Sequence, residues 1–425
     1  MAKCLARVIG IFFLAVSAAP LVAMEAKLSA SIGGEHTDNS LQTDSGERSD
    51  FENKLGVILG LAHEGADVQT EINYQALRTH YTKDTQADNT EVNGNLDLTY
   101  EQIESALYWR FNNSIRNIVK DKAANDIAEN RENRSNTTLS PELIVRLSDA
   151  DQLRTNLSYN DIRYEDSEQD STRKGGGVQW FHLISAVDNV GLLLNYSDVT
   201  FDRDEDAYDY YQGFVNYSAN LSKLTYSLSM GYNETQRGGT EDTGGNFVDA
   251  EFDYVSGPSS WGLVLSQELT DTSRGNDNQG FEQISSFQTT GSEIDIFELT
   301  AVRFSWANSG ICGACILNTF VSFEMEDYET LADDSEELSA DISFSYNLTR
   351  LSTVSFGLGY SDFSFDEENL RTDYQLLRVR VNYTQTITRD VSLRFFIANE
   401  GRDSDGGSSD YDELRGGVSI NYDFY

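Results

Sequence analysis

Apolar and polar residues alternate strictly through most of this chain, from Leu28 onward, in stretches of roughly ten positions. In the final stretch Val418, Ile420, Tyr422 and Phe424 point to one face of an extended strand, and the polar residues between them point to the other. A helical period would scatter such a set, and about ten residues is the length that a tilted strand needs to cross a bilayer. The pattern therefore predicts strands of membrane-spanning length. The same alternation occurs at Val391, Leu393, Phe395 and Ile397; at Ile342, Phe344, Tyr346 and Leu348; at Val354, Phe356, Leu358 and Tyr360; and at Leu192, Leu194 and Tyr196.

The connections between these strands alternate between very short turns and long acidic loops rich in Asn, Gly and Ser. This asymmetry is typical of bacterial outer-membrane barrels. We count nine short turns and ten long loops, which join twenty strands, with eighteen as the alternative because the stretches near Asn95 and Asp295 have mixed phase. No later stretch approaches the roughly 18 apolar residues of a transmembrane helix. We therefore predict an all-β chain, a transmembrane antiparallel up-and-down β-barrel of about 18–20 strands.

Soluble β-proteins also alternate, and they are the main rival to this interpretation. A propeller would repeat a blade motif, and we find none. A soluble sandwich would not need ladders of nearly constant length, nor 22 Tyr and 22 Phe with many near strand ends, where the aromatic girdles of a membrane barrel lie. The membrane barrel is therefore the preferred fold.

The two chain ends indicate export to the outer membrane. Lys3 and Arg7 precede a short apolar stretch, Val8–Ala19, which predicts a signal peptide over residues 1–23 and a barrel over residues 24–425. Cleavage after Ala26 is the second choice. The last strand closes on Phe424 and Tyr425 and resembles the assembly signal of outer-membrane barrels, although Phe is usually the final residue.

The charge of the chain excludes one class of partner. It carries 70 acidic and 31 basic residues, for a formal charge of −39, so no nucleic acid is expected to bind. The expected partners are outer-membrane lipid and lipopolysaccharide. The oligomeric state is left open, because trimers are common among porins only by analogy.

The segment from Ala106 to Trp180 carries the most specific motifs. It has Trp109 on a strand, then an Asn130-Arg131-Glu132 element, a Pro141-Glu142-Leu143 strand start, and Tyr164-Glu165 before an Asp170-Ser171-x-Arg173 loop. This order resembles the outer-membrane β-barrel porins encoded with exopolysaccharide and exosortase-type gene clusters, which commonly have Gly where this chain has Ser140. The resemblance implies a surface-polysaccharide link, with a polysaccharide or its export machinery as a further partner. It implies no enzymatic chemistry.

The four histidines are the candidate residues for catalysis. A barrel phospholipase needs Ser, His and an orienting polar group together, and a barrel protease needs His and Asp at the outer rim. His36 and His80 are expected near the outer rim, and His63 and His182 near the periplasmic side. Because acids are near every part of this chain, we interpret these histidines as polar loop-edge residues. We predict a protein that is not an enzyme.

Cys312 and Cys315 form a Cys-Gly-Ala-Cys unit at a short turn facing the oxidising periplasm. A disulfide that braces the turn is the favoured interpretation, and free thiols are the alternative. A zinc site would need two more ligands and a thioredoxin-type site would need a following helix, so we predict no metal site and no cofactor. The acidic run lacks the central Gly and the distal Glu of a calcium loop, and we interpret it as a solvated loop. That run comprises Asp202, Asp204, Glu205, Asp206 and Asp209.

Three arginines on the predicted polar face are the candidate pore-lining residues. Arg378, Arg380 and Arg394 lie on adjacent predicted strands, where they would attract an anionic saccharide or set an anion preference. The preferred alternative is that lumenal carboxylates neutralise them. Examples of such carboxylates are Asp341, Glu251, Asp253 and Asp423.

The expected width of the barrel sets the functional prediction. A barrel of 18–20 strands encloses an aqueous lumen, whereas about eight strands do not. We predict a porin-like channel that takes part in exopolysaccharide export or surface display. The alternatives are a non-conducting barrel that scaffolds a secretion assembly and, third, an outer-rim barrel hydrolase. A long loop expected over Asn112–Thr138 favours a scaffold or a gated exporter if it folds into the lumen.

Overall fold

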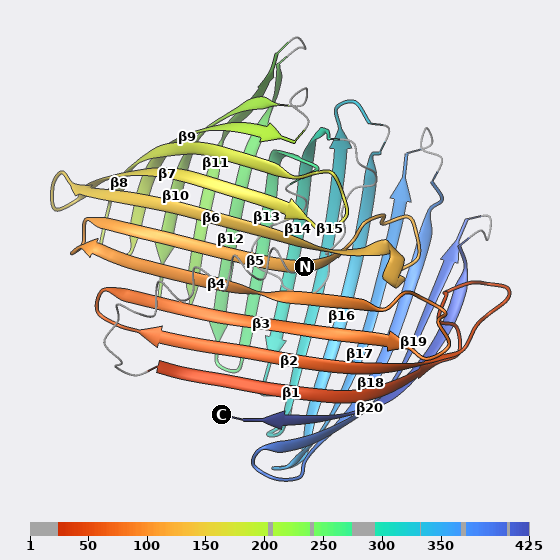
Figure 1. Cartoon of the computed structure of the whole chain (residues 1–425). Helices are drawn as coiled ribbons and strands as arrows, with labels where there is room; N and C mark the ends of the chain where they lie inside the picture. The colour runs from red at the N-terminus through yellow and green to blue at the C-terminus, as the bar shows by residue number, and fades with distance from the viewer. Residues whose placement is uncertain are drawn as a thin grey trace.

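The computed structural model describes residues 24–202, 207–238, 242–273, 294–331, 333–366, 371–405 and 409–424. They form twenty antiparallel strands and one short 3-10 helix, η1 (Figure 1). Within these ranges no helix is long and apolar enough to span a membrane. The strands are β1 (Met24–Thr37), β2 (Asp50–Glu64), β3 (Val68–Tyr81), β4 (Asn89–Ile103), β5 (Leu107–Val119), β6 (Arg131–Arg146), β7 (Asp151–Tyr164), β8 (Ser171–Leu183), β9 (Asp188–Phe201), β10 (Tyr208–Asn220), β11 (Leu224–Arg237), β12 (Thr243–Ser256), β13 (Ser259–Asp271), β14 (Ile296–Asn308), β15 (Cys315–Tyr328), β16 (Ser335–Thr349), β17 (Ser352–Phe365), β18 (Tyr374–Thr386), β19 (Val391–Ser404) and β20 (Tyr411–Asp423), and η1 spans Ala128–Asn130.

Each strand pairs with its neighbours in sequence, and the first strand closes the sheet by pairing with the last. Ile32 of β1 lies opposite Leu55 of β2 on one side and opposite Ile420 of β20 on the other. The sheet is therefore a closed up-and-down barrel, visible as a ring of tilted strands in Figure 1. The predicted fold class and the count of twenty strands are confirmed.

The connections follow the predicted alternation of short and long. The connections at the end where β1 begins and β20 ends contain two to six residues, and those at the opposite end contain five or more. One predicted bound was wrong. The strands on either side of the expected Asn112–Thr138 loop continue to Val119 and restart at Arg131, so the connection is only residues 120–130. The signal peptide, most of the acidic run at 204–206 and residues 274–293 of the longest loop lie outside the described residues.

Register assigns an outer and an inner face to every strand. Ile32, Leu55 and Ile420 occupy one face of three paired strands and are exposed, like the other large apolar residues of that face. The opposite face carries buried Ser29, Glu35 and Glu52, among many other polar residues. Apolar side chains that face outward around a closed barrel match a surrounding of lipid, and a polar interior matches a lumen lined by water.

Strand pairing is interrupted at the end of the barrel that carries the longer connections, here the long-loop end. Pairing of β12 with β13 stops at Val248 and Gln267, although β12 continues to pair with β11, and β13 with β14. Beyond this point Leu269 lies on the same face of β13 as the exposed Trp261, yet it is buried. It packs with Val199, Phe201 and Tyr208 from the inner faces of β9 and β10. The upper part of the β13–β14 hairpin therefore leaves the wall and lies inside the barrel.

Candidate functional site: the lumen and the loop that crosses it

The loop of residues 120–130 between β5 and β6, here the crossing loop, reaches the opposite wall of the barrel. The Lys122 ammonium donates to the carboxylate of Glu326 on β15 and to the hydroxyl of Ser335 on β16. β15 lies ten strands from β5 in either direction around the barrel. Glu326 alternates with the exposed Val321 and so faces inward. Because Lys122 is only 5% exposed, this ion pair is a buried anchor across the lumen.

Backbone carbonyls of the crossing loop are bound by side chains from β18 and β19. The Tyr374 hydroxyl donates to the Lys122 carbonyl at 2.6 Å. The Arg402 guanidinium donates to the carbonyls of Ala123 at 2.6 Å and Ala124 at 3.1 Å, and it stacks on the Tyr374 ring at 3.6 Å from the centroid. Ala123 also packs on a buried cluster of four aromatic residues and Leu376. These contacts fix the path of the main chain and not only one side chain.

Polar contacts inside the crossing loop hold its shape. The Asn130 amide donates to the carbonyls of Asp121 and Asn125, which closes the loop on itself. Asp126 accepts a 2.6 Å hydrogen bond from Arg131. Burial raises the pKa of Asp126, but the hydrogen bond and the charge of Arg131 lower it by more, so the net pKa lies below the ordinary value. The loop therefore docks with Asp126 ionised at neutral pH.

A second inward element covers another part of the long-loop end. Asp271, at the end of β13, accepts hydrogen bonds from Arg173 of β8 and Tyr208 of β10. The Tyr164 hydroxyl of β7 donates to the Ser273 carbonyl at 2.6 Å. Asp271 and Ser273 have no exposed surface. The crossing loop and the β13–β14 hairpin therefore bind to different parts of the inner wall and narrow the same end of the barrel.

The inner wall of β18, β19, β20, β1 and β2 carries a band of paired charges. Arg378 donates to Glu400 at 3.0 Å, directly across the β18–β19 pair. Lys54 lies 2.6 Å from Glu35 and 3.0 Å from Glu52. A lumenal carboxylate does pair with Arg378, as the preferred alternative expects, but it is Glu400 and not one of the four carboxylates given as examples. The short turn over residues 387–390 places residue 400 opposite residue 378, and counting outward from this turn in the sequence could have identified Glu400.

Arg380 and Arg394 lie on the same face and are arranged differently. Both donate to the side-chain oxygen of Asn382, at 3.1 Å for Arg380 Nε and 2.8 Å for Arg394 Nη2. Both side chains are exposed. Within the described part of the chain, neither has a carboxylate at ion-pair distance. Their role in lining a pore remains a prediction.

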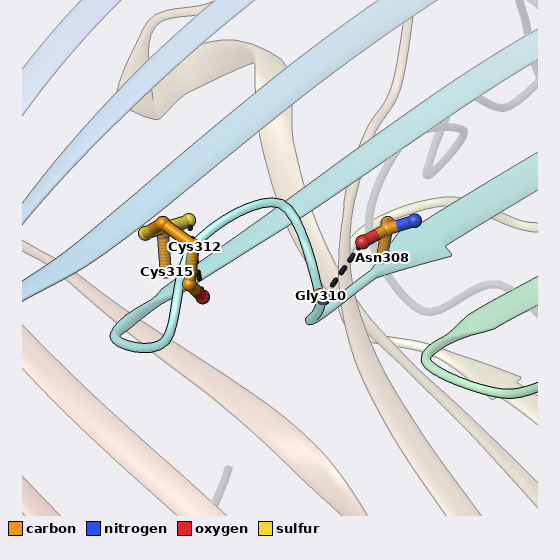
Figure 2. The surroundings of a disulfide bond; sticks show 4 residues. All are labelled: Asn308, Gly310, Cys312 and Cys315. Atoms are coloured by element: carbon orange, nitrogen blue, oxygen red, sulfur yellow. Dashed lines mark hydrogen bonds between the residues drawn. A yellow bond between two sulfur atoms is a disulfide. The ribbon is translucent and has the colours of Figure 1, made fainter.

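Cys312 and Cys315 are joined as a disulfide in the β14–β15 connection (Figure 2). Their Cα atoms are 5.4 Å apart, and the Cys315 amide donates to the Cys312 carbonyl at 3.4 Å. In the same connection the Gly310 amide donates to the Asn308 side chain at 2.7 Å. The bond therefore lies in a short turn at the end of the barrel where β1 begins and β20 ends, away from the crossing loop.

The histidines lie at strand ends. His80 Nδ1 is 2.9 Å from Asp88, exposed on the outer side of the long-loop end, and His182 Nδ1 is 2.9 Å from Asp151 beside a short turn. The Ser148 hydroxyl also donates to Asp151, at 2.7 Å, so it bonds the carboxylate and not the imidazole of His182. The expectation that the protein is not an enzyme stays a prediction.

Sequence reasoning missed the anchors of the crossing loop. Lys122, Tyr374 and Arg402 carry no local motif, and their contacts join residues more than 200 positions apart. The length and polarity of the expected loop were the signals that pointed to this region. They did not show whether the loop folds inward.

No protein-family model matches the chain, and no curated protein matches its sequence. The fold is similar to several solved outer-membrane barrels. OpdK of Pseudomonas aeruginosa is 9% identical, with a TM-score of 0.40 over 94% of this chain and 99% of that chain. An anion-selective porin from Comamonas acidovorans is 11% identical, with a TM-score of 0.40 over 95% and 100%. The FrpB iron transporter from Neisseria meningitidis is 9% identical, with a TM-score of 0.46 over 95% and 83%.

Proposed function

We propose that this protein is an outer-membrane channel for small hydrophilic solutes, narrowed at its long-loop end by the crossing loop. The observation that carries the proposal is the loop itself, which spans a polar lumen from β5 to an inward-facing Glu326 on β15. A barrel of twenty strands is wide enough to conduct, so an element placed across it sets which solutes pass. The link to exopolysaccharide export or surface display belongs to this proposal and rests on the sequence resemblance alone.

A non-conducting scaffold is the second candidate, and one observation favours it. Two inward elements meet the wall through fully or nearly fully buried contacts, at Lys122 and at Asp271. If these elements close the lumen, the barrel would be a structural support for a secretion assembly. The two candidates differ in whether solutes pass while both elements are docked.

Swelling of liposomes that contain the refolded protein tests the proposal. Small neutral solutes such as glucose are expected to enter, and the rate is expected to fall steeply with the size of the saccharide. A variant in which residues 122–127 are replaced by a short Gly-Ser linker is expected to admit larger saccharides. Correctly folded protein that admits nothing, with or without the loop, would contradict the channel and favour the scaffold.

A further inference from the structure

Two arginines lie side by side on the inner wall of β18 and β19, and among the described residues no carboxylate is within 4.0 Å of either guanidinium. Arg380 and Arg394 both donate to the same oxygen of Asn382, so their guanidinium groups are close neighbours. The amide nitrogen of Asn382 donates to the Ser355 hydroxyl of β17 at 3.2 Å, which turns the oxygen toward the arginines. Two like charges placed together in this way disfavour one another unless an anion joins them.

An aromatic ring supports one of the two arginines. Phe396 lies directly across from Asn382 in the β18–β19 register, and the Arg380 guanidinium stacks on its ring at 4.5 Å from the centroid. Stacking fixes the plane of the guanidinium and leaves its edge free to donate. The site therefore has an oriented fork of donors beside an apolar ring.

The surroundings distinguish this pair from the other charges of the same wall. Arg378, one step nearer the crossing loop, is neutralised by Glu400, and Lys54 is neutralised by Glu35 and Glu52. Arg380 and Arg394 are exposed, and both lie closer than Arg378 to the short turn between β18 and β19. A solute moving along this wall from that side meets them before it reaches the charges beneath the crossing loop.

We propose that Arg380, Arg394, Asn382 and Phe396 form a binding site for organic carboxylates. A planar carboxylate matches the geometry of an arginine fork, and the Phe396 ring offers an apolar contact for the carbon skeleton that carries it. The inference rests on the proposed channel for the route by which such a solute arrives. It deepens that proposal by naming the class of solute.

Saturation-transfer NMR on the detergent-solubilised protein tests the site with glucuronate and glucose. The two sugars have the same ring and differ in the carboxylate. Glucuronate is expected to bind saturably at low salt, and glucose is expected to bind at least tenfold more weakly. R380Q and R394Q are each expected to weaken glucuronate binding about tenfold, because hydrogen bonds between charged groups are the strong ones.

Arg154 provides the matched control. It stacks on Phe181 at 4.8 Å on β7 and β8, but Glu142 lies 4.0 Å away as a partner, so R154Q is expected to leave glucuronate binding unchanged. Equal losses in R154Q and R380Q would overturn the site in favour of a diffuse charge effect. Displacement of glucuronate by inorganic phosphate at equal concentration would overturn the preference for organic carboxylates.

This assay does not require the lumen to conduct, so it separates the two proposals. Binding by a protein that admits no solute into liposomes would contradict the channel and leave the site intact. Solute entry without glucuronate binding would contradict the site and leave the channel intact.

Discussion

Lys122→Met is the substitution that most sharply tests the anchor of the crossing loop. It removes the ammonium and leaves the Glu326 carboxylate, whose side chain is only 16% exposed, without its cation. Removing one partner of a buried ion pair costs about 3–5 kcal/mol. Taking about 3 kcal/mol, because Glu326 keeps hydrogen bonds from Tyr328 and Ser335, the ratio of docked to undocked loop falls by a factor of about 100.

Limited proteolysis with an elastase measures the ratio of docked to undocked loop. The enzyme cleaves after Ala123 and Ala124 only when the loop leaves the wall. Cleavage follows the population of the open form when opening is fast relative to cleavage. We expect cleavage of K122M to be about 100-fold faster than that of the unmodified protein. K122M/E326Q is expected to recover part of the loss, because it no longer buries an unpaired charge.

Lys120→Met is the matched control in the same loop. Lys120 Nζ lies 3.8 Å from Asp166, and water reaches both side chains, which are 32% and 62% exposed. An exposed pair of this kind contributes at most about 1 kcal/mol, so K120M is expected to change the cleavage rate by less than fivefold. Equal rates for K122M and K120M would refute the buried anchor.

Four further results are expected from other contacts. Y374F removes the hydroxyl that binds the Lys122 carbonyl at 2.6 Å, and a loss of about 1 kcal/mol should raise elastase cleavage about fivefold. The pKa of Asp126 in the docked loop lies below its ordinary value of about 3.9. The contribution of Asp126 to docking is therefore complete above that value and is lost as the pH falls through the docked pKa. The channel current should become noisier in acid, and this change should be absent in D126N. R173M removes the buried cation that pairs with Asp271 at the β13–β14 hairpin. It should lower the temperature at which the barrel loses its compact mobility in detergent gels, whereas R389M, at a turn where the side chain is 93% exposed, should not. C312S/C315S opens a cross-link between residues three positions apart and should cost about 2 kcal/mol or less, with no change in conductance.

Much of the fold follows from the sequence because lipid imposes a strict pattern. Each strand must place apolar residues outward at every second position, as Val418, Ile420 and Tyr422 do, and a shift by one residue would turn them all inward. Turn positions such as Thr388–Asp390 then fix the register of both neighbours. This is why the strand count and the short turns agree with the structure.

Apolar and polar alternation no longer predicts a strand where the strands extend beyond the apolar band of the barrel. Asn117, Ile118 and Val119 extend β5 without an apolar and polar alternation. Backbone pairing with β6 and the hydrogen bond from the Asn117 amide to Asn133 of β6 support them. The sequence pattern was therefore interpreted as loop from Asn112 onward. The same reasoning explains why the inward course of the β13–β14 hairpin was not expected, since Leu269 continues the outward pattern of its strand and packs inside.

The lumen could be predicted only in part. Alternation placed Arg378, Arg380 and Arg394 on one face, and it could not tell that Arg378 is neutralised while Asn382 gathers the other two. That difference depends on which residues lie opposite across β18 and β19. The anchors of the crossing loop depend on closure of the whole barrel, which brings β15 opposite β5.

Single-channel conductance in planar bilayers tests the central claim most directly, by comparing the unmodified protein with the variant that lacks residues 122–127. We expect steady small steps for the unmodified protein and clearly larger steps for the shortened loop, because the loop crosses the lumen. Equal conductance of the two proteins, with both correctly folded, would contradict the claim that this loop limits the channel.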